Sequence, residues 1–311
     1  MTAAALTRPP RLGPDARIAV VAPSGPVVEE RLRRGLDVLR GWGLDPVATG
    51  QVTDRHPRFG YLAGEDDKRA RDFQEAWCDP TVDAVMCARG GYGAQRMVDL
   101  LDWNALRAAR PKVLIGFSDI TALHEAFAVR LGLVTLHGPM TSALTFLDDA
   151  AAQESLRTTL FEPEAAMTLG RPGAGPLVGG RARGVTLGGC LSLLAAGLAT
   201  PHARPRAAGG LLLIEDIGEE DYRLDRAVTQ LLRAGWLDGV AGVALGSWKD
   251  CGPYDRRVRP VLRDRLAPLG VPVVENLGFG HCDTALTMPL GVPAVLDAEA
   301  GTVTLDVPAL A

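Results

Sequence analysis

Residues 113–130 read VLIGFSDITALHEAFAVR. The uninterrupted apolar run at 113–117 is typical of a buried strand, and apolar side chains then recur with helical spacing through 120–130. Two similar apolar runs precede this segment, RIAVVA at 17–22 and AVMCA at 84–88. Segments with helical periodicity also precede it, and helices are expected at about 28–39, 68–77 and 94–101. Strands that alternate with helices of this length predict a parallel sheet joined by crossover helices.

The second half of the chain repeats this alternation after a region of different composition. Residues 148–180 are first polar and then rich in glycine and proline, which predicts a link between two domains. We therefore expect an N-terminal domain at 1–150, a linker at 151–180 and a C-terminal domain at 181–311. Further strands are expected at 211–214, 240–246, 271–274 and 303–306, with helices at 222–234 and 258–266. The predicted fold class is α/β, with a parallel, flavodoxin-like sheet in the N-terminal domain and a smaller mixed α/β C-terminal domain.

Composition restricts the partners and the compartment. The 311 residues carry 33 Lys and Arg against 37 Asp and Glu, without a basic block, which argues against nucleic acid as a partner. Five cysteines form no Cys-x-x-Cys pair and favour reduced thiols in the cytoplasm. The N-terminus lacks the apolar core of a signal peptide, and no stretch is apolar enough to predict a membrane span. A cytoplasmic protein without membrane contact is expected.

Ser118 is the first candidate for chemistry. It lies between the strand at 113–117 and the helix that follows, where a sharp turn would project its hydroxyl out of the sheet. The N–H groups at the start of the helix could then stabilise a developing oxyanion. The sequence has Ile120 where the G-x-S-x-G pattern requires its last glycine. A serine that merely caps the helix is the alternative, and context alone favours it.

Two glycine-containing turns follow other strands of the same predicted sheet. ARGGYG at 88–93 follows the strand at 84–88, and Ser24 and Gly25 follow the first strand. Open α/β sheets bind ligands at the carboxyl ends of their strands, and paired glycines let backbone N–H groups approach a ligand. Simple tight turns explain these glycines about equally well.

A serine nucleophile needs a base and a carboxylate that orients it. The chain has five histidines, which are His56, His124, His137, His202 and His281. His137 follows an apolar run close to Ser118, whereas His281 lies in a glycine-flanked loop, NLGFGHCD at 276–283. Glu215 and Asp216 end a predicted strand, but the acidic residues after them also fit a solvated turn. Residue chemistry alone leaves these choices open.

Several cofactor and metal motifs are missing from the sequence. There is no phosphate-binding P-loop, no Cys/His zinc spacing, no EF-hand loop and no G-x-G-x-x-G between a strand and a helix. A hydrolase that needs no cofactor and no metal is the enzyme class that remains.

These segments together resemble the LD-carboxypeptidases, also called muramoyltetrapeptide carboxypeptidases, and the related microcin C immunity hydrolases. The matching segments run from IAVVAPSG at 18–25 to LTMPLG at 286–291, with five others between them. Those five are ARGGYG at 88–93, GFSDITAL at 116–123, LHGPM at 136–140, LIEDIGEEDYRLDR at 213–226 and GFGH at 278–281. The resemblance therefore spans almost the whole chain.

The resemblance implies a serine peptidase with a Ser-Glu-His triad shared between two domains. Carried over by motif, the nucleophile is Ser118, the glutamate is Glu215 and the histidine is His281. It also implies a murein tetrapeptide substrate, cut before its terminal D-alanine, and a homodimer. One departure is visible, because Cys190 stands where relatives commonly have asparagine, so the fine specificity that the resemblance implies does not carry over where that asparagine shapes the substrate site.

The remaining site residues follow from this mechanism. The backbone N–H groups of Asp119 and of Gly90 or Gly91 are expected to bind the oxyanion. The substrate carboxylate needs a cation, for which Arg89 and Arg223 are candidates, and Ser24 faces the same predicted crevice. Two alternatives stay open, namely an immunity-type hydrolase of peptidyl or aminoacyl nucleotide amides and a non-catalytic muropeptide-binding module.

Overall fold

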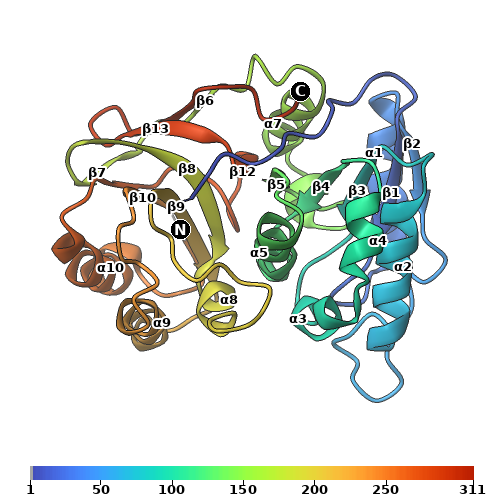
Figure 1. The fold of residues 1–311 in the computed structure, drawn as a ribbon, viewed down its shortest axis with the longest axis horizontal. Coiled ribbons are helices and arrows are strands. Elements are labelled where there is room, and N and C mark those ends of the chain that lie inside the picture. The colour runs from blue at the N-terminus through green and yellow to red at the C-terminus, as the bar shows by residue number, and fades with distance from the viewer. Residues whose placement is uncertain (1–2) are drawn as a thin grey trace.

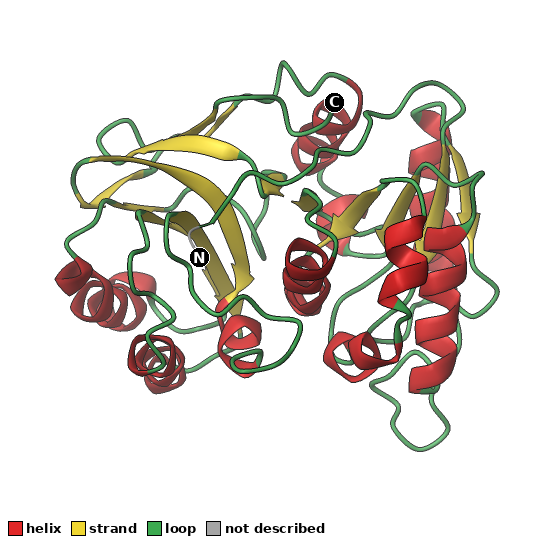
Figure 2. Cartoon of the chain, viewed as in Figure 1, coloured by secondary structure: helices red, strands yellow, loops and turns green. Residues whose placement is uncertain are grey.

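The computed structural model describes residues 3–311, whose strands form two sheets (Figures 1 and 2). The first sheet has six strands in the order β12-β5-β4-β3-β1-β2. Its members are β1 (Arg17–Val21), β2 (Asp45–Ala48), β3 (Ala84–Cys87), β4 (Val113–Gly116), β5 (Thr135–His137) and β12 (Met288–Leu290). Strands β1 to β5 are all parallel and lie in the flavodoxin-like order 2-1-3-4-5 across the sheet. The predicted α/β class and flavodoxin-like sheet are thus confirmed.

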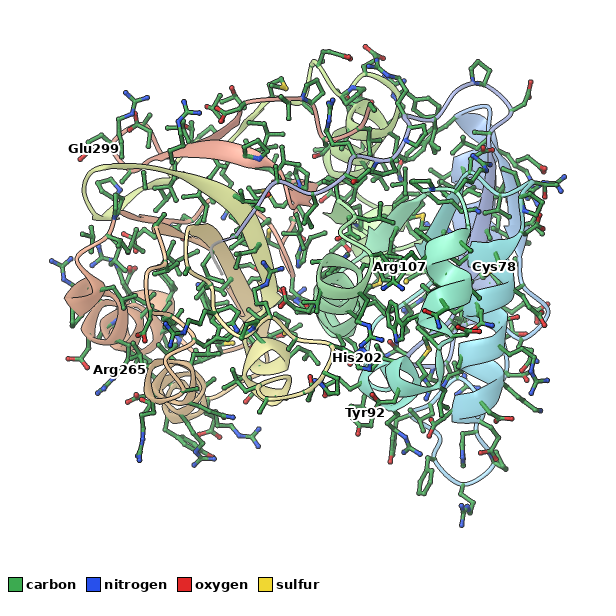
Figure 3. All side chains as sticks on the ribbon, viewed as in Figure 1. Cys78, Tyr92, Arg107, His202, Arg265 and Glu299 are labelled. Carbon is green, nitrogen blue, oxygen red and sulfur yellow. The ribbon has the colours of Figure 1, made fainter. Side chains whose placement is uncertain are left out.

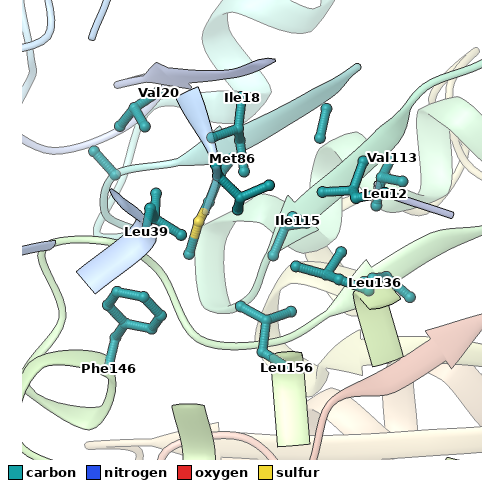
Figure 4. Packing of buried hydrophobic residues seen from close by; sticks show 14 of the residues in the cluster. Leu12, Ile18, Val20, Leu39, Met86, Val113, Ile115, Leu136, Phe146 and Leu156 are labelled. Carbon is teal, nitrogen blue, oxygen red and sulfur yellow. The ribbon is translucent and has the colours of Figure 1, made fainter. Parts of the chain in front are cut away.

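Apolar side chains cover both faces of this sheet. Along β1, Ile18 and Val20 join one hydrophobic cluster while Ala19 and Val21 join the other, because successive side chains of a strand point to opposite faces. Figure 4 shows the first cluster, in which Leu156 packs near Ile115. The helices of this half are α1 (Glu29–Gly41), α2 (Asp66–Cys78), α3 (Ala94–Met97), α4 (Trp103–Ala108), α5 (Thr121–Arg130), α6 (Leu144–Leu147) and α7 (Ala150–Phe161).

The second sheet has eight strands in the order β6-β14-β13-β8-β9-β10-β11-β7. Its strands are β6 (Thr168–Leu169), β7 (Gly175–Val178), β8 (Arg181–Cys190), β9 (Gly210–Ile217), β10 (Gly242–Lys249), β11 (Val273–Glu275), β13 (Pro293–Asp297) and β14 (Thr302–Leu305). The four central strands β8 to β11 are parallel, and the flanking strands are antiparallel. One face packs against α8 (Leu191–Ala196), α9 (Asp221–Arg233) and α10 (Arg259–Leu266). This half is the mixed α/β unit that the sequence predicts.

Two segments that were given a structure in the sequence expectation differ from it, and the strands β2, β5, β8, β12 and β13 were not expected. Residues 151–180, expected as a linker, contain most of α7 together with β6 and β7. The apolar residues of α7 lie at helical spacing but are few, so their signal was hidden by the polar residues between them. The helix expected at 94–101 ends at Met97 and continues as the 3-10 turn η1 (Val98–Leu100).

Both chain ends cross between the two halves. Near the N-terminus the backbone of Ala3 donates to Ala208 of the second half, and Thr7 bridges Leu133 beside the first sheet. At the other end Ala311 exchanges backbone hydrogen bonds with Pro9 and Arg11. β12 comes from the C-terminal part of the chain yet pairs with β5 in the first sheet. The two halves are therefore joined by several passages of the chain (Figure 1).

Candidate active site

Ser118 has a backbone conformation that side chains rarely adopt. It follows β4 and begins the 3-10 turn η2 (Ser118–Ile120), with a φ of +64°. A left-handed residue at this point reverses the chain sharply, as the predicted strand-to-helix elbow requires. Gly116 makes the turn possible, because a Cβ there would come within 2.9 Å of the Ile120 side chain. In the described chain no side-chain cap is formed at η2 or α5, so Ser118 is not a helix cap.

The glycine loop after β3 lies directly against Ser118. A Cβ built on Gly90 would lie 3.2 Å from Ser118 Oγ, so the glycine backbone approaches the hydroxyl more closely than a larger residue would without a shift of its neighbours. Gly25, after β1, donates its N–H to the Gly90 carbonyl at 3.1 Å. The loops after β1, β3 and β4 thus meet at the carboxyl ends of their strands, where the strand order of the sheet reverses.

Asp119 holds these three loops together. Its Oδ2 accepts a hydrogen bond from Ser24 Oγ at 2.6 Å and another from the backbone N–H of Ala94 at 2.8 Å. Burial raises the pKa of Asp119, while these two hydrogen bonds oppose the rise. Ser24 is itself fully buried, which leaves its side chain no surface for a substrate. The side chain of Ser24 therefore supports the loops from beneath.

Glu215 and His281 form a short hydrogen bond in the second half of the chain. Glu215 lies in β9 and is fully buried, and its Oε2 lies 2.6 Å from His281 Nδ1 and 3.2 Å from the His281 backbone N. Gly280 makes room for this contact, because a Cβ there would collide with the same oxygen. Burial alone would raise the pKa of Glu215, but attraction by His281 and contacts with His137 and His281 lower it to about 2. The carboxylate is therefore ionised, so Nδ1 carries the proton and Nε2 is free to accept one.

Two further histidines lie behind this pair. His137 Nε2 is 3.8 Å from Glu215 Oε1, and both atoms are buried without a hydrogen-bond partner among residues 3–311. His124 Nε2 bonds the Gly116 carbonyl at 2.9 Å, and burial, with a contribution from His137, lowers its pKa to about 3. His124 is therefore neutral and buried at neutral pH. Neither residue faces solvent as a general base must.

The two halves meet at aromatic contacts beside Ser118. The ring of Phe117, the residue before the serine, lies 4.7 Å from the His281 ring and 5.8 Å from the His137 ring, measured between centroids. The end of β8 packs on the same turn, since the N–H of Cys190 donates to Thr121 Oγ1 at 2.9 Å. Ser118, Glu215 and His281 are thereby gathered at one interface, although they are 97 and 66 residues apart in the chain.

The other predicted site residues lie at varying distances from this interface. Arg89 is exposed and donates to the Pro26 carbonyl at 3.0 Å, next to Gly90 and Gly91. Arg223 is exposed on α9 and pairs with Glu219 at 3.2 Å. Cys190 is buried and its Sγ lies 3.2 Å from Asp216 Oδ1. The structure therefore places Arg89 beside the glycine loop and gives Arg223 and Cys190 partners within the protein.

The two remaining histidines are engaged away from Ser118. His56 contacts Glu65 at 3.0 Å in the loop before α2. His202, labelled in Figure 3 between the two halves, lies 2.8 Å from Asp99. Of the five histidines, His281 is the one that is both partly exposed and bonded to a buried carboxylate.

Two features of this interface carry no sequence signal that we recognised. His137 was considered as a base, but its place behind Glu215 depends on the pairing of β4 with β5. Arg171 lies beside the His281 loop although it is more than 100 residues away in the chain. Only the folded chain shows either contact.

Comparison with known proteins identifies the family of the chain. Residues 18–138 match the LD-carboxypeptidase N-terminal domain, and residues 183–296 match the LD-carboxypeptidase C-terminal domain. The chain belongs to the LD-carboxypeptidase family. A Streptomyces coelicolor protein whose name assigns it as a carboxypeptidase is 70% identical to this chain over 305 residues, with 98% of each chain covered.

Two relatives carry more specific names. The murein tetrapeptide carboxypeptidase of Pseudomonas aeruginosa is 33% identical over 291 residues, covering 91% of this chain and 94% of the relative. The crystal structure of muramoyltetrapeptide carboxypeptidase from Oxalobacter formigenes superposes with a TM-score of 0.78 at 30% identity, covering 94% of this chain and all of the other. Family membership makes this LD-carboxypeptidase a serine-type hydrolase. The resemblance seen in the sequence is thereby confirmed.

Residues 3–311 contain neither a metal-binding cluster nor a membrane-spanning helix. No group of three or more His, Cys, Asp or Glu side chains in this range is arranged to hold a metal ion. No helix within the same range combines the length and the apolar character that a membrane crossing requires.

Proposed function

We propose that this enzyme hydrolyses the bond before the terminal D-alanine of a murein tetrapeptide, with Ser118 as nucleophile and His281 as general base. The observation that carries the proposal is the 2.6 Å contact between buried, ionised Glu215 and His281, which lies at the interface with the Ser118 turn. The names of the Pseudomonas and Oxalobacter relatives support the substrate class.

The proposed first step is attack of Ser118 Oγ on the peptide carbonyl. His281 Nε2 accepts the serine proton and then donates it to the leaving amine. Glu215 keeps Nδ1 protonated and stabilises the imidazolium that forms, because its carboxylate stays charged in a buried position. Water then attacks the acyl-enzyme by the reverse route and releases the shortened peptide.

The negative charge that develops on the carbonyl oxygen needs backbone donors. We assign this role to the N–H groups of Asp119 and of Gly90 or Gly91, which flank Ser118. The approach of Gly90 to Ser118 and the start of η2 at Ser118 support the assignment. Asp119 contributes through its backbone, while its side chain holds the neighbouring loops in place.

The proposal extends to the surroundings of the enzyme. All five cysteines are free thiols, which supports a reducing compartment and thus the cytoplasm. The family resemblance supports a homodimer, which light scattering on the purified protein would test.

The experiment that tests the function is D-alanine release from a purified murein tetrapeptide, followed by mass spectrometry. We expect release by the wild type and none by Ser118→Ala, with circular dichroism showing that the variant is folded. A fluorophosphonate should label the wild type on the peptide that contains residue 118 and leave Ser118→Ala unlabelled.

Three results would contradict the proposal. Wild-type rates in Ser118→Ala would exclude the serine as nucleophile. A clear preference for aminoacyl nucleotide amides over the tetrapeptide would favour an immunity-type hydrolase. Measurable tetrapeptide binding without turnover or labelling would indicate a binding module.

A further inference from the structure

A cavity of about 360 Å³ opens beside His281 at the carboxyl end of β10. It is bounded on one side by the last residues of β10 and on another by the loop that carries His281. Its lining includes the polar or charged side chains of Arg171, Ser247, Trp248, Lys249 and His281. The cavity therefore adjoins the imidazole proposed as general base, but on the second half of the molecule.

Arg171 is held in a fixed position at this cavity. Its Nε donates to the Asn276 carbonyl at 3.1 Å, and its stem crosses the backbone of Gly278. A Cβ on Gly278 would collide with Arg171 Cδ, so only glycine leaves room for the arginine. The charge of Arg171 also opposes the rise in pKa that burial causes at Cys282, which places the guanidinium beside the residue that follows His281.

The cations of the cavity have no acidic partner within the described chain. Neither Arg171 nor Lys249 forms an ion pair with any residue of the range 3–311, and Lys249 is exposed. The Glu275 carboxylate nearby is already bound by Arg259 and by the Tyr254 hydroxyl, each at 2.8 Å. Asp283 is the one exposed acid among the lining residues. The arginine is thus free to bind an anion through its terminal nitrogens.

Two neutral donors have no partner either. Ser247 Oγ and Trp248 Nε1 are buried atoms without a hydrogen-bond acceptor in residues 3–311, and Trp248 is only 7% exposed. Buried polar atoms are normally hydrogen-bonded, so unpartnered donors in the wall of a cavity indicate that a ligand or water supplies the acceptor. Two cations and two donors around one cavity favour a ligand with several acceptor oxygens.

The chemistry of the proposed reaction identifies that ligand. His281 must give its proton to the leaving amine, so the leaving residue lies on the histidine side of the scissile bond and away from the oxyanion donors. The leaving residue of a carboxypeptidase carries the free terminal carboxylate. Resting on the proposed function, we infer that Arg171 and Lys249 form the subsite that binds this terminal carboxylate. Arg89 belongs instead to the glycine loop after β3 and is not among the residues that line this cavity.

The test compares a murein tetrapeptide with the same peptide bearing a C-terminal carboxamide. For the wild type we expect kcat/KM to be about 100-fold higher on the free acid, because charge-assisted hydrogen bonds to the carboxylate are lost with the amide. Arg171→Gln keeps most of the stem over Gly278 and should lower kcat/KM on the free acid about 30-fold. Lys249→Ala should lower it about fivefold. Both variants should leave the rate on the amide within about twofold of wild type.

Matched variants separate this inference from the proposed function. Arg31→Ala removes an exposed arginine of α1 that forms no ion pair within the described chain, and it should change neither rate. If wild type cleaves both peptides but Arg171→Gln and Lys249→Ala slow them equally, the carboxylate subsite is wrong while the function stands. The same holds if Arg89→Gln, and not Arg171→Gln, removes the preference for the free acid. If wild type cleaves neither peptide, the function itself is wrong, and the subsite with it.

Discussion

The left-handed backbone of Ser118 lowers the stability of the fold in order to place the serine hydroxyl at the site. A residue with a side chain at φ +64° is less stable than glycine at the same place, by about 1 kcal/mol. The strain persists because η2 and the Gly90 loop fix the turn from both sides. The serine is thus held in the one conformation that exposes its hydroxyl to the interface.

This strain predicts a difference between two inactive variants. Ser118→Ala and Ser118→Gly both lack the hydroxyl, but only the glycine relieves the left-handed conformation. We expect Ser118→Gly to have a free energy of unfolding about 1 kcal/mol higher than Ser118→Ala, measured by urea denaturation. Equal stabilities would show that the turn is not strained.

His137 is a second residue whose effect can be tested singly. Its Nε2 lies 3.8 Å from the oxygen of Glu215 that His281 does not use, close enough for an electrostatic contact although not for a hydrogen bond. We expect His137→Phe to lower kcat about tenfold with little change in KM, because the carboxylate loses one of its two supports. His137→Gln, which retains a donor, should recover part of the rate.

The pH profile of His137→Phe distinguishes a role of His137 in positioning Glu215 from general damage to the fold. His137 helps to lower the pKa of Glu215, so that pKa should rise in His137→Phe and the acid limb of kcat/KM should move to higher pH. Asp216 and Cys190 also lie near this carboxylate and His124 lies near His137, but none of the three changes in the variant. An unmoved acid limb together with a large loss of stability would assign His137 a purely structural role.

Residue chemistry predicted some of these roles and missed others for a physical reason. The elbow at Ser118 was visible because a strand, a turn and a helix are local features of the sequence. The choice of Glu215 and His281 needed the family resemblance, since a solvated acidic turn and an ordinary surface loop have the same local composition. The contact of Arg171 with the His281 loop is non-local, and no periodicity or motif records it.

At the scale of elements, α5 couples the nucleophile turn to acid stability. His124 lies in this helix, and its pKa of about 3 is well below the ordinary 6.5 because burial disfavours its charged form. In the unfolded chain the same histidine binds a proton below pH 6.5. The unfolded state therefore gains protons that the folded state does not, and stability falls as the pH falls from 6.5 towards 3.

The contribution of His124 can be isolated by substitution. Between pH 7 and pH 5, protonation of His124 in the unfolded chain should reduce the free energy of unfolding of the wild type by about 2 kcal/mol. His124→Gln keeps a donor for the Gly116 carbonyl and cannot titrate, so its stability should fall by about 2 kcal/mol less over that interval. Urea denaturation at the two pH values measures both. Parallel pH dependences would show that His124 does not stay neutral.

Elements were predicted best where the apolar pattern is strong. The strands at 17–22, 84–88 and 113–117 correspond to β1, β3 and β4, because buried parallel strands are continuous apolar runs. The short strands β6 and β7 were missed, since two to four residues rich in glycine and proline carry no period. Their place in the sheet is decided by tertiary pairing with β14 and β11.

At the scale of the whole molecule, the two halves are joined by a buried ion pair. Glu125 of α5 accepts from Arg204 Nε at 2.9 and 2.8 Å, and Arg204 lies in the loop after α8. The side chains are 8% and 16% exposed, so removing one leaves the other charge with little solvent. The pair therefore resists separation of the halves more than an exposed pair would.

A double-mutant cycle measures this contribution. Glu125→Ala should lower the free energy of unfolding by about 3 kcal/mol, because the arginine charge is left uncompensated. Glu125→Met with Arg204→Met should cost less than either single change, since both charges leave together. The exposed pair of Arg33 and Glu30 is the control, for which Glu30→Ala should change stability by less than about 0.5 kcal/mol. A small effect of Glu125→Ala would mean that the halves are held by their apolar contacts.

The position of β12 also constrains how this protein is made. Residues 288–290 complete the edge of the first sheet beside β5, and β5 carries His137. During synthesis that edge stays unpaired until residue 290 of 311 has left the ribosome, although the other five strands are available by residue 137. An open, apolar edge is a surface on which nascent chains associate with one another. We therefore expect the nascent N-terminal half to be especially prone to association, because a chain that stops before residue 288 exposes the edge of β5 that pairs with β12 in the finished protein.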